Sequence, residues 1–189
     1  MCGIIGGSQV LIPPEIIKQS LLTIQHRGPD DFGIHQENDV FIGMRRLSII
    51  DVEGGHQPIT NEDHSIHVVF NGEIYNFEDL IRPLRAKGHI FRTESDTEVL
   101  LHLWEEYGID MCEHLRGMFA FAIWDSNARQ IFLARDRFGK KPLYYMRTNA
   151  GGLLFASELK ALLPLVQATE EQLVINQQAI YDYLSLLAV

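Results

Sequence analysis

The sequence contains no run of about 18 apolar residues, so it predicts no membrane-spanning helix. Residues 1–7 lack a basic region followed by a long apolar stretch, so we expect no signal peptide. The only cysteines, Cys2 and Cys112, are too few for a disulfide framework and favour a reducing, cytoplasmic setting. There is no low-complexity tract and no internal repeat, which excludes a repeat architecture.

Basic residues are also scarce. The 16 lysines and arginines stand against 25 aspartates and glutamates, giving a formal net charge of −9. This balance disfavours binding to nucleic acid or to an anionic membrane surface. The 8 histidines are scattered: no two lie four residues apart on a predicted helix, and there is no Cys-x-x-Cys motif. The sequence therefore predicts no metal site.

The chain has 189 residues, 46% of them hydrophobic, which is enough for one globular domain with a sizeable core. Its last residues, 181–189, form an apolar, helix-like run, whereas the ends of domains are more often polar. We therefore expect residues 1–189 to be a single domain taken from a longer chain.

The hydrophobic pattern predicts a layered α+β sandwich with mainly antiparallel strands. Residues 119–124 place Phe, Phe and Ile on one face and Ala, Ala and Trp on the other, so both faces of that sheet must be covered by other layers. We expect strands at about 2–10, 40–50, 66–70, 119–124, 130–134, 142–146 and 153–156, and helices at about 14–25, 77–87, 95–107, 158–163 and 177–187.

The helix at 95–107 begins with Ser95-Asp96-Thr97-Glu98, which fits a capping box. In that motif the Ser95 side chain accepts a hydrogen bond from the Glu98 amide. Asp96 would then lie in the first helical turn, where the helix dipole keeps a carboxylate ionised. The carboxylate could pair with a substrate ammonium group or could simply stabilise the helix.

Cys2 is the first candidate for chemistry. Removal of Met1 would leave a thiol and a free α-amine on one residue, and an amine with a pKa of about 7.7–8.0 is a suitable base for activating the thiol. The alternative is a small buried cysteine at the start of a strand.

Two further segments could complete a site. The amide of Asn71 and the backbone N–H of Gly72 could converge on one oxygen as an oxyanion hole, although Asn-Gly is also a common turn. Arg46 interrupts an apolar strand and needs an anionic partner, either a substrate carboxylate or a protein carboxylate such as Asp51. Residues 136–141 lack the glycine pattern of a phosphate-binding loop, and we interpret them as structural or as a contact with another domain.

Together these segments resemble the class II glutamine amidotransferases, a branch of the N-terminal-nucleophile hydrolases, and in particular the N-terminal glutaminase domain of glutamine-dependent asparagine synthetases. Eight segments carry the resemblance, in order: Met-Cys-Gly-Ile (1–4), His-Arg-Gly-Pro-Asp (26–30), Arg-Leu-Ser-Ile-Ile-Asp (46–51), Gly-His-Gln-Pro (55–58), Phe-Asn-Gly-Glu-Ile-Tyr-Asn (70–76), Ser-Asp-Thr-Glu (95–98), Ala-Arg-Asp-Arg-Phe-Gly (134–139) and Ser-Glu-Leu-Lys (157–160).

The resemblance implies a four-layer αββα fold and gives each candidate residue a role. Cys2 would be the nucleophile, with Asn71 and Gly72 as the oxyanion hole. Arg46 would bind the α-carboxylate of L-glutamine, while Glu73 and Asp96 would bind its α-ammonium group. Backbone groups would line the pocket at Leu47, Ser48, Ile49 and Ile50.

The resemblance also implies a partner and a division of labour. A C-terminal synthetase domain of the same chain would use the ammonia, and ATP and magnesium would belong to that domain, so no cofactor is expected in residues 1–189. Aspartate is the expected acceptor of the ammonia.

Two alternative functions stay open at this point, and so does the oligomeric state. The same scaffold could be a non-catalytic module that binds glutamine or regulates a partner, as it would be if Met1 were retained. It could be the glutaminase domain of another class II amidotransferase. The oligomeric state is not set by the sequence, and a homodimer stays open.

Overall fold

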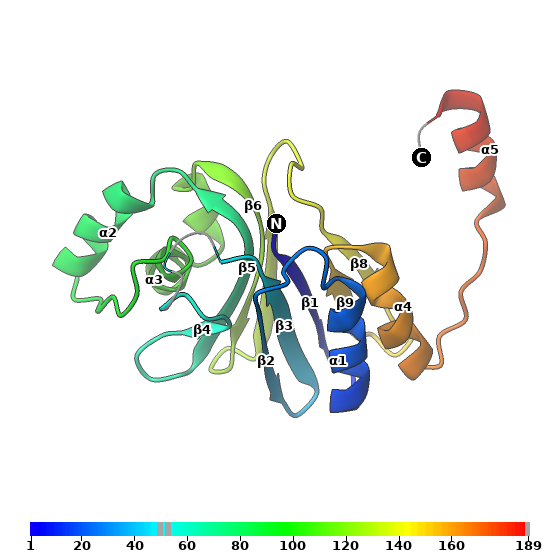
Figure 1. Cartoon of the computed structure of the whole chain (residues 1–189), viewed down its shortest axis with the longest axis horizontal. Helices are drawn as coiled ribbons and strands as arrows, with labels where there is room; N and C mark the ends of the chain where they lie inside the picture. The colour runs from blue at the N-terminus through cyan, green and yellow to red at the C-terminus, as the bar shows by residue number, and fades with distance from the viewer. Residues whose placement is uncertain (49–50, 52–53, 188–189) are drawn as a thin grey trace.

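The computed structural model describes residues 1–48, 51 and 54–187. Its strands form two antiparallel sheets that stack face to face (Figure 1). The first sheet, sheet A, contains β1 (Gly3–Ser8), β2 (Asp31–Glu37), β3 (Val40–Arg46), β8 (Tyr144–Arg147) and β9 (Leu153–Ala156), in the spatial order β2-β3-β1-β9-β8. The second, sheet B, contains β4 (Ile59–Thr60), β5 (Ile66–Ile74), β6 (Gly117–Asp125) and β7 (Gln130–Arg135), in that order.

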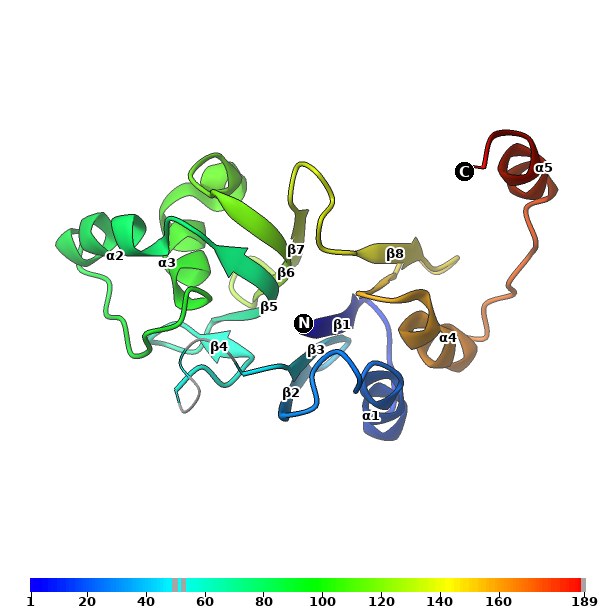
Figure 2. The same cartoon turned by 45° about the horizontal axis from the view of Figure 1, so that its top comes forward.

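Helices cover the outer faces of both sheets (Figure 2). Helices α1 (Pro14–Thr23) and α4 (Leu159–Ala168) pack on sheet A. Helix α3 (Glu98–Tyr107) packs on sheet B, with α2 (Phe77–Ala86) and the short 3-10 helix η1 (Gly108–Glu113) beside it. The order of layers is helix, sheet, sheet, helix, which confirms the αββα sandwich.

The core has three parts, one in each space between layers. Strand β6 shows how they are divided. Phe119, Phe121 and Ile123 face α3, whereas Ala120, Ala122 and Trp124 face sheet A. The expectation that both faces of this strand are covered is therefore confirmed, with helices on one side and a second sheet on the other.

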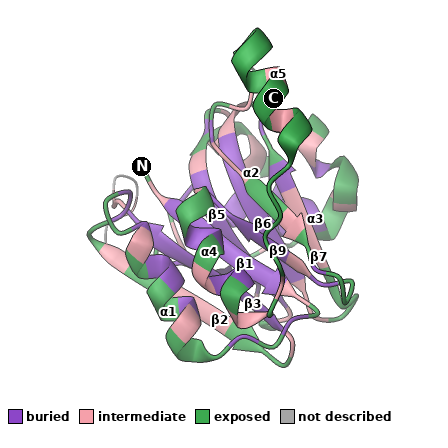
Figure 3. Ribbon diagram, turned by 90° about the vertical axis from the view of Figure 1, so that its right-hand side faces the viewer, coloured by how far each residue is buried: buried purple, intermediate pink, exposed green. Residues whose placement is uncertain are grey.

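The last helix, α5 (Gln177–Leu186), stands apart from these layers at the end of an extended segment (Figure 1). None of its residues is buried, as the exposure colouring shows (Figure 3). Apolar side chains along it are exposed to solvent, among them Leu184 and Leu186, each 74% exposed. In the described part of the chain, no helix is both long and apolar enough to cross a bilayer.

The structure departs from the expected elements in two respects. Strands β2 and β4 were not expected: β2 mixes polar and apolar residues and pairs along the whole length of β3, and β4 has only 2 residues. The prediction of a capping box at residues 95–98 is wrong. Helix α3 begins at Glu98, whose carboxylate instead accepts hydrogen bonds from the backbone N–H groups of Arg92 and Thr93 at 2.8 and 2.7 Å.

Candidate active site

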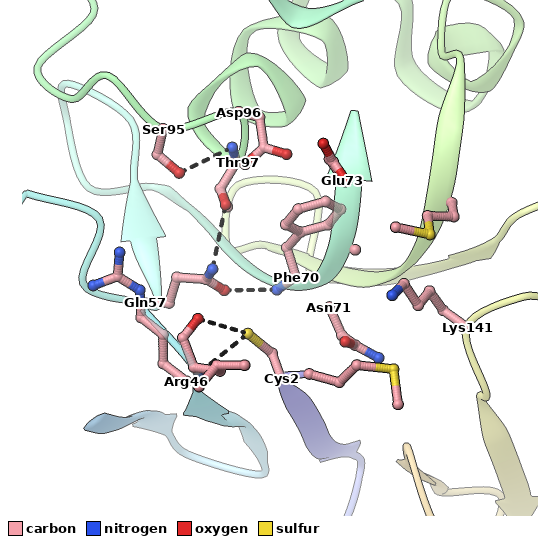
Figure 4. Close-up of a pocket in the computed structure, with 14 residues that line it drawn as sticks. Cys2, Arg46, Gln57, Phe70, Asn71, Glu73, Ser95, Asp96, Thr97 and Lys141 are labelled. Carbon is pink, nitrogen blue, oxygen red and sulfur yellow. Dashed lines mark hydrogen bonds between the residues drawn. The ribbon is translucent and has the colours of Figure 1, made fainter. Parts of the chain in front are cut away.

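A pocket of about 400 Å³ opens at one end of the space between the two sheets (Figure 4). It lies where the inward faces of several strands change from apolar to polar. On β5, Val69 faces sheet A, and alternation carries Asn71 and Glu73 onto the same face. On β3, the inward series ends at Arg46, and on β1 it begins at Cys2. The lining residues are Met1, Cys2, Arg46, Leu47, Gln57, Phe70, Asn71, Gly72, Glu73, Ser95, Asp96, Thr97, Met118 and Lys141.

The backbone around Cys2 is held by residues from the ends of other elements. The Arg27 Nε group donates to the Cys2 carbonyl oxygen at 2.8 Å, and Arg27 also pairs with Glu158 at 3.0 Å. The Ile4 N–H donates to the Ser157 hydroxyl at 2.9 Å. These contacts give a structural reason for two of the matched segments, 26–30 and 157–160.

The Cys2 thiol lies against the backbone of Leu47. The Leu47 N–H donates to the Cys2 sulfur at 3.4 Å, and the sulfur lies 3.7 Å from the Leu47 carbonyl oxygen. These two contacts hold the thiol against the backbone of Leu47. Leu47 is thus one of the residues that line the pocket, and its backbone contacts the sulfur.

Asn71 is 1% exposed, and its side-chain Nδ2 group has no hydrogen-bond partner among the described residues. Figure 4 shows this amide on the Cys2 side of the pocket. A buried amide N–H without an acceptor costs about 1–3 kcal/mol and is rare in proteins. Such a donor in the pocket of a thiol is suited to an oxyanion hole, because it is unoccupied until negative charge develops.

Asp96 lies at the opposite side of the pocket from Cys2 and is 4% exposed. The expectation that it lies in the first turn of a capped helix is wrong, whereas a pKa of about 6 still leaves the carboxylate ionised at neutral pH. Asp96 precedes α3, and burial, together with the negative charge of Glu73, raises its pKa to about 6. Backbone hydrogen bonds lower this pKa in part, and the largest of these effects comes from the Ile74 N–H, which donates to Asp96 Oδ2 at 2.9 Å. A cationic ligand would therefore stabilise the ionised form of this buried carboxylate.

Gln57 connects the Asp96 loop to sheet B, a role that the sequence did not reveal. Its side-chain oxygen accepts from the Phe70 N–H at 2.7 Å, and its side-chain nitrogen donates to the Thr97 hydroxyl at 3.2 Å. Ser95 accepts from the Thr97 N–H at 3.2 Å within the same loop. In the sequence, Gln57 was marked only by the segment Gly-His-Gln-Pro (55–58), one of the eight segments that carry the family resemblance.

Residues 46–50, at the end of β3 and directly after it, were predicted to bind the substrate, and their placement in the structure agrees only in part. Arg46 is buried, lines the pocket and donates to the Asp51 carbonyl oxygen at 2.6 Å. Ser48 does not line the pocket, and its N–H donates to Asp30 at 2.9 Å. Ile49 and Ile50 lie outside the described residues.

Lys141 was not predicted as a pocket residue, yet its side chain points into the pocket near Asn71 (Figure 4). The loop that carries it is organised by Asp136. The Asp136 carboxylate accepts hydrogen bonds from the N–H groups of Phe119, Phe138, Lys140 and Lys141, at 2.9 to 3.2 Å. The interpretation of residues 136–141 as a structural loop therefore missed that its last residue reaches the site.

Two stacked antiparallel sheets between helices, with a cysteine at the head of a central strand, define an αββα sandwich of the N-terminal-nucleophile hydrolase type. The family described as the glutamine amidotransferase domain matches residues 1–189, and the chain belongs to this family.

Curated relatives and a solved structure agree with this membership. The chain is 44% identical to "Asparagine synthetase [glutamine-hydrolyzing] 1" of Bacillus subtilis over 98% of its own length and 29% of that protein. It is 46% identical to "Asparagine synthetase [glutamine-hydrolyzing] 2" of the same organism over 86% of its length and 22% of that protein. The chain thus spans less than a third of these relatives.

The structural comparison extends to a more distant amidotransferase. The glutamine phosphoribosylpyrophosphate amidotransferase of B. subtilis, solved with ADP and GMP, superposes with a TM-score of 0.71 at 25% identity. The match covers 85% of this chain and 43% of that one.

Proposed function

We propose that this chain hydrolyses L-glutamine to glutamate and ammonia through a γ-glutamyl thioester on Cys2. The observation that carries the proposal is the buried Nδ2 group of Asn71, which has no partner among the described residues and belongs to the same pocket as the Cys2 thiol. Membership in the glutamine amidotransferase family supports the choice of substrate.

The first step needs a free α-amine on Cys2. While Met1 is present, the Cys2 nitrogen is an amide and cannot act as a base. After Met1 is removed, the amine takes the thiol proton and the thiolate attacks the side-chain carbonyl carbon of glutamine. The resulting ammonium group then returns a proton to the leaving nitrogen, and ammonia departs. The same amine next takes a proton from water, which attacks the thioester and releases glutamate.

The two donors proposed for the oxyanion hole are Asn71 Nδ2 and the Gly72 N–H. Both come from the same strand end, so their spacing is fixed by β5 rather than by a loop. A Cβ at Gly72 would lie 2.2 Å from the Met118 carbonyl oxygen, which explains why this position has no side chain. The donors are ordered before substrate binds, as electrostatic stabilisation of a transition state requires.

Recognition of a free amino acid would come from charge. The carboxylates of Asp96 and Glu73 would bind the α-ammonium group, and Arg46 would bind the α-carboxylate. Binding energy from these remote groups would orient the side-chain amide against Cys2. Residues 48–50 remain part of the proposed substrate-binding segment, with Leu47 contributing its backbone.

We further propose that the ammonia serves the amidation of a carboxylate, with aspartate as the preferred acceptor. The relatives named asparagine synthetase support this proposal, because their greater length leaves room for a synthetase domain. ATP and magnesium would act in that domain rather than in this pocket. A reducing, cytoplasmic setting would keep Cys2 as a free thiol.

The proposal is tested by the release of glutamate from glutamine, measured alongside the mass of the N-terminus. Protein that has lost Met1 should release glutamate and form a hydroxylamine-sensitive thioester. Cys2→Ala should abolish both, whereas Cys112→Ala, which changes the chain's other cysteine, should preserve both.

A chain with an N-terminal extension that cannot be removed provides the second control. It should behave like Cys2→Ala, because its Cys2 amine is blocked although the thiol is intact. The absence of glutamate release from correctly processed protein would overturn the proposal and favour a non-catalytic module.

A further inference from the structure

A second cluster of functional side chains lies away from the Cys2 pocket. Glu62 follows β4, His89 lies between α2 and α3, and His102 lies within α3. One potential ligand atom from each residue lies within 4.8 Å of the other two. None of the three residues lines the pocket.

His102 has one engaged nitrogen and one unsatisfied nitrogen. It is 1% exposed, and its Nδ1 lies 2.9 Å from Glu105 Oε2. A proton on Nδ1 donated to this carboxylate leaves Nε2 as a lone pair. That Nε2 is buried and has no hydrogen-bond partner among the described residues. An orphaned lone pair of this kind is costly, and a metal ion would satisfy it.

The other two residues are arranged in a similar way. His89 Nε2 lies 3.0 Å from Glu106 Oε1, which leaves Nδ1 as the second nitrogen. Glu62 uses Oε1 to accept from the Ile90 N–H at 3.0 Å, which leaves Oε2. A histidine held by a carboxylate through one nitrogen, with the other nitrogen available, is the usual arrangement behind a metal ligand.

The local charges favour a cation. Lys87 pairs with Glu106, but the ion-pair partners of Glu105 in the described chain are the two histidines alone. His89 Nδ1 lies 3.2 Å from Glu105 Oε2, so a lone pair there would face a carboxylate oxygen.

We infer that Glu62, His89 and His102 bind a divalent transition metal, with Zn²⁺ as the ion that fits best. Two imidazoles and one carboxylate suit zinc, whereas calcium and magnesium require oxygen ligands. This inference reverses the expectation of no metal site. The histidine spacing gave no signal, because the three ligands come from three separate segments.

Such a metal would connect the β4–β5 turn, the α2–α3 connection and α3. The α2–α3 connection continues from His89 to Asp96, so the ion would restrain the segment that carries one wall of the pocket.

The site is tested by titrating metal-free protein with Zn²⁺ and with Co²⁺. We expect one Zn²⁺ per chain, a higher melting temperature in its presence, and no comparable effect of Ca²⁺ or Mg²⁺. Glu62→Gln and His89→Gln should each weaken binding at least tenfold. They are the decisive variants, because His102 is buried and His102→Gln could fail to fold.

Two control variants separate this site from other metal-binding groups. His26→Gln removes an exposed histidine that pairs with Glu158, and Cys2→Ala removes the soft ligand of the pocket. Both should keep full Zn²⁺ affinity, and bound Co²⁺ should show no thiolate charge-transfer absorption. The inference is overturned by no uptake at about 100 µM Zn²⁺. It is also overturned by binding that survives Glu62→Gln and His89→Gln, or that Cys2→Ala abolishes. None of these results depends on whether the protein hydrolyses glutamine.

Discussion

The two walls of the Cys2 pocket are built differently. The wall that carries Cys2, Asn71 and Gly72 consists of strand ends, whose side chains are placed by sheet register. The wall that carries Ser95, Asp96 and Thr97 is a loop, held to sheet B by individual side-chain hydrogen bonds.

This difference separates the proposed chemistry from the proposed recognition. A strand end cannot move without breaking a ladder of backbone hydrogen bonds, so it suits donors that must be ordered in advance. A loop held by a few side-chain bonds can adjust when a charged ligand arrives. The wall formed by Cys2, Asn71 and Gly72 is therefore the rigid wall, and the wall formed by Ser95, Asp96 and Thr97 is the adjustable wall.

Asn71→Ala should have the largest effect. Removing one oxyanion-hole donor lowers kcat by about 10²–10³. KM should change little, because the donor acts on charge that develops only in the transition state. Steady-state glutaminase kinetics check this, with circular dichroism to confirm folding. A rise in KM larger than the fall in kcat would instead place Asn71 in ground-state binding.

Gly72→Ala should damage the rigid wall itself. The added Cβ would lie 2.2 Å from the Met118 carbonyl oxygen and 2.8 Å from the Phe119 Cα, and both are backbone atoms of the paired strand. Overpacking of this kind costs about 1–3 kcal/mol of unfolding free energy, which urea denaturation measures. Gly43→Ala on β3 is the matched control, because its closest contact would be 3.3 Å and its loss should be smaller.

Asp96→Asn tests the adjustable wall through pH. The Asp96 pKa is raised from 3.8 to about 6, so the carboxylate becomes protonated as pH falls through 6 and loses its attraction for an ammonium group. Below that pH, kcat/KM for glutamine should fall by about a further tenfold per pH unit in the unmodified protein, beyond the fall that protonation of the Cys2 amine causes. In Asp96→Asn, kcat/KM should be lower at neutral pH and should lack this limb. Glu73→Gln, which changes an exposed carboxylate, should shift the limb to lower pH.

The raised pKa of Asp96 also predicts how the unfolding free energy depends on pH. Ionisation of Asp96 favours substrate binding but disfavours folding. Because the folded pKa lies above the unfolded value, the contribution of Asp96 is fully present below about 3.8 and is lost as pH rises through about 6. At pH 8 the ionised carboxylate therefore destabilises the fold. Asp96→Asn should raise the unfolding free energy there by up to about 2–3 kcal/mol, measured by denaturation at pH 8 and at pH 5. Equal effects at the two pH values would contradict the raised pKa.

The rigid wall could be predicted from the sequence more fully than the adjustable wall, where Asp96 was named as a candidate but assigned to a helix start. Alternation along residues 119–124 was enough to predict a sheet covered on both faces, because period-two patterns describe strands directly. The expected strand at 66–70 stopped short of Asn71 and Gly72, whereas β5 continues through both residues to Ile74. The resemblance supplied their proposed roles.

The errors concern residues placed by contacts distant in the sequence. Local spacing placed Asp96 at the start of a helix. Its pKa is instead set by burial in the pocket wall and by the hydrogen bond that it accepts from the Ile74 N–H. Lys141 reaches the site because Asp136 folds its loop around four backbone N–H groups, which no local pattern indicates. The Gln57 bridge between β5 and Thr97 is of the same kind.

Ser157→Ala should have the smallest effect, and it tests how far the rigidity of the strand wall depends on its surroundings. The Ser157 hydroxyl accepts from the Ile4 N–H at 2.9 Å, while the Ser157 N–H donates to the Ile4 carbonyl oxygen at 2.8 Å. The variant keeps the second bond and loses the first, which leaves a buried N–H unsatisfied at a cost of about 1–2 kcal/mol. Since Ile4 lies two residues from Cys2, a small fall in kcat without a change in KM should accompany this loss. A normal kcat in a destabilised variant would show instead that Arg27 alone holds the nucleophile in place.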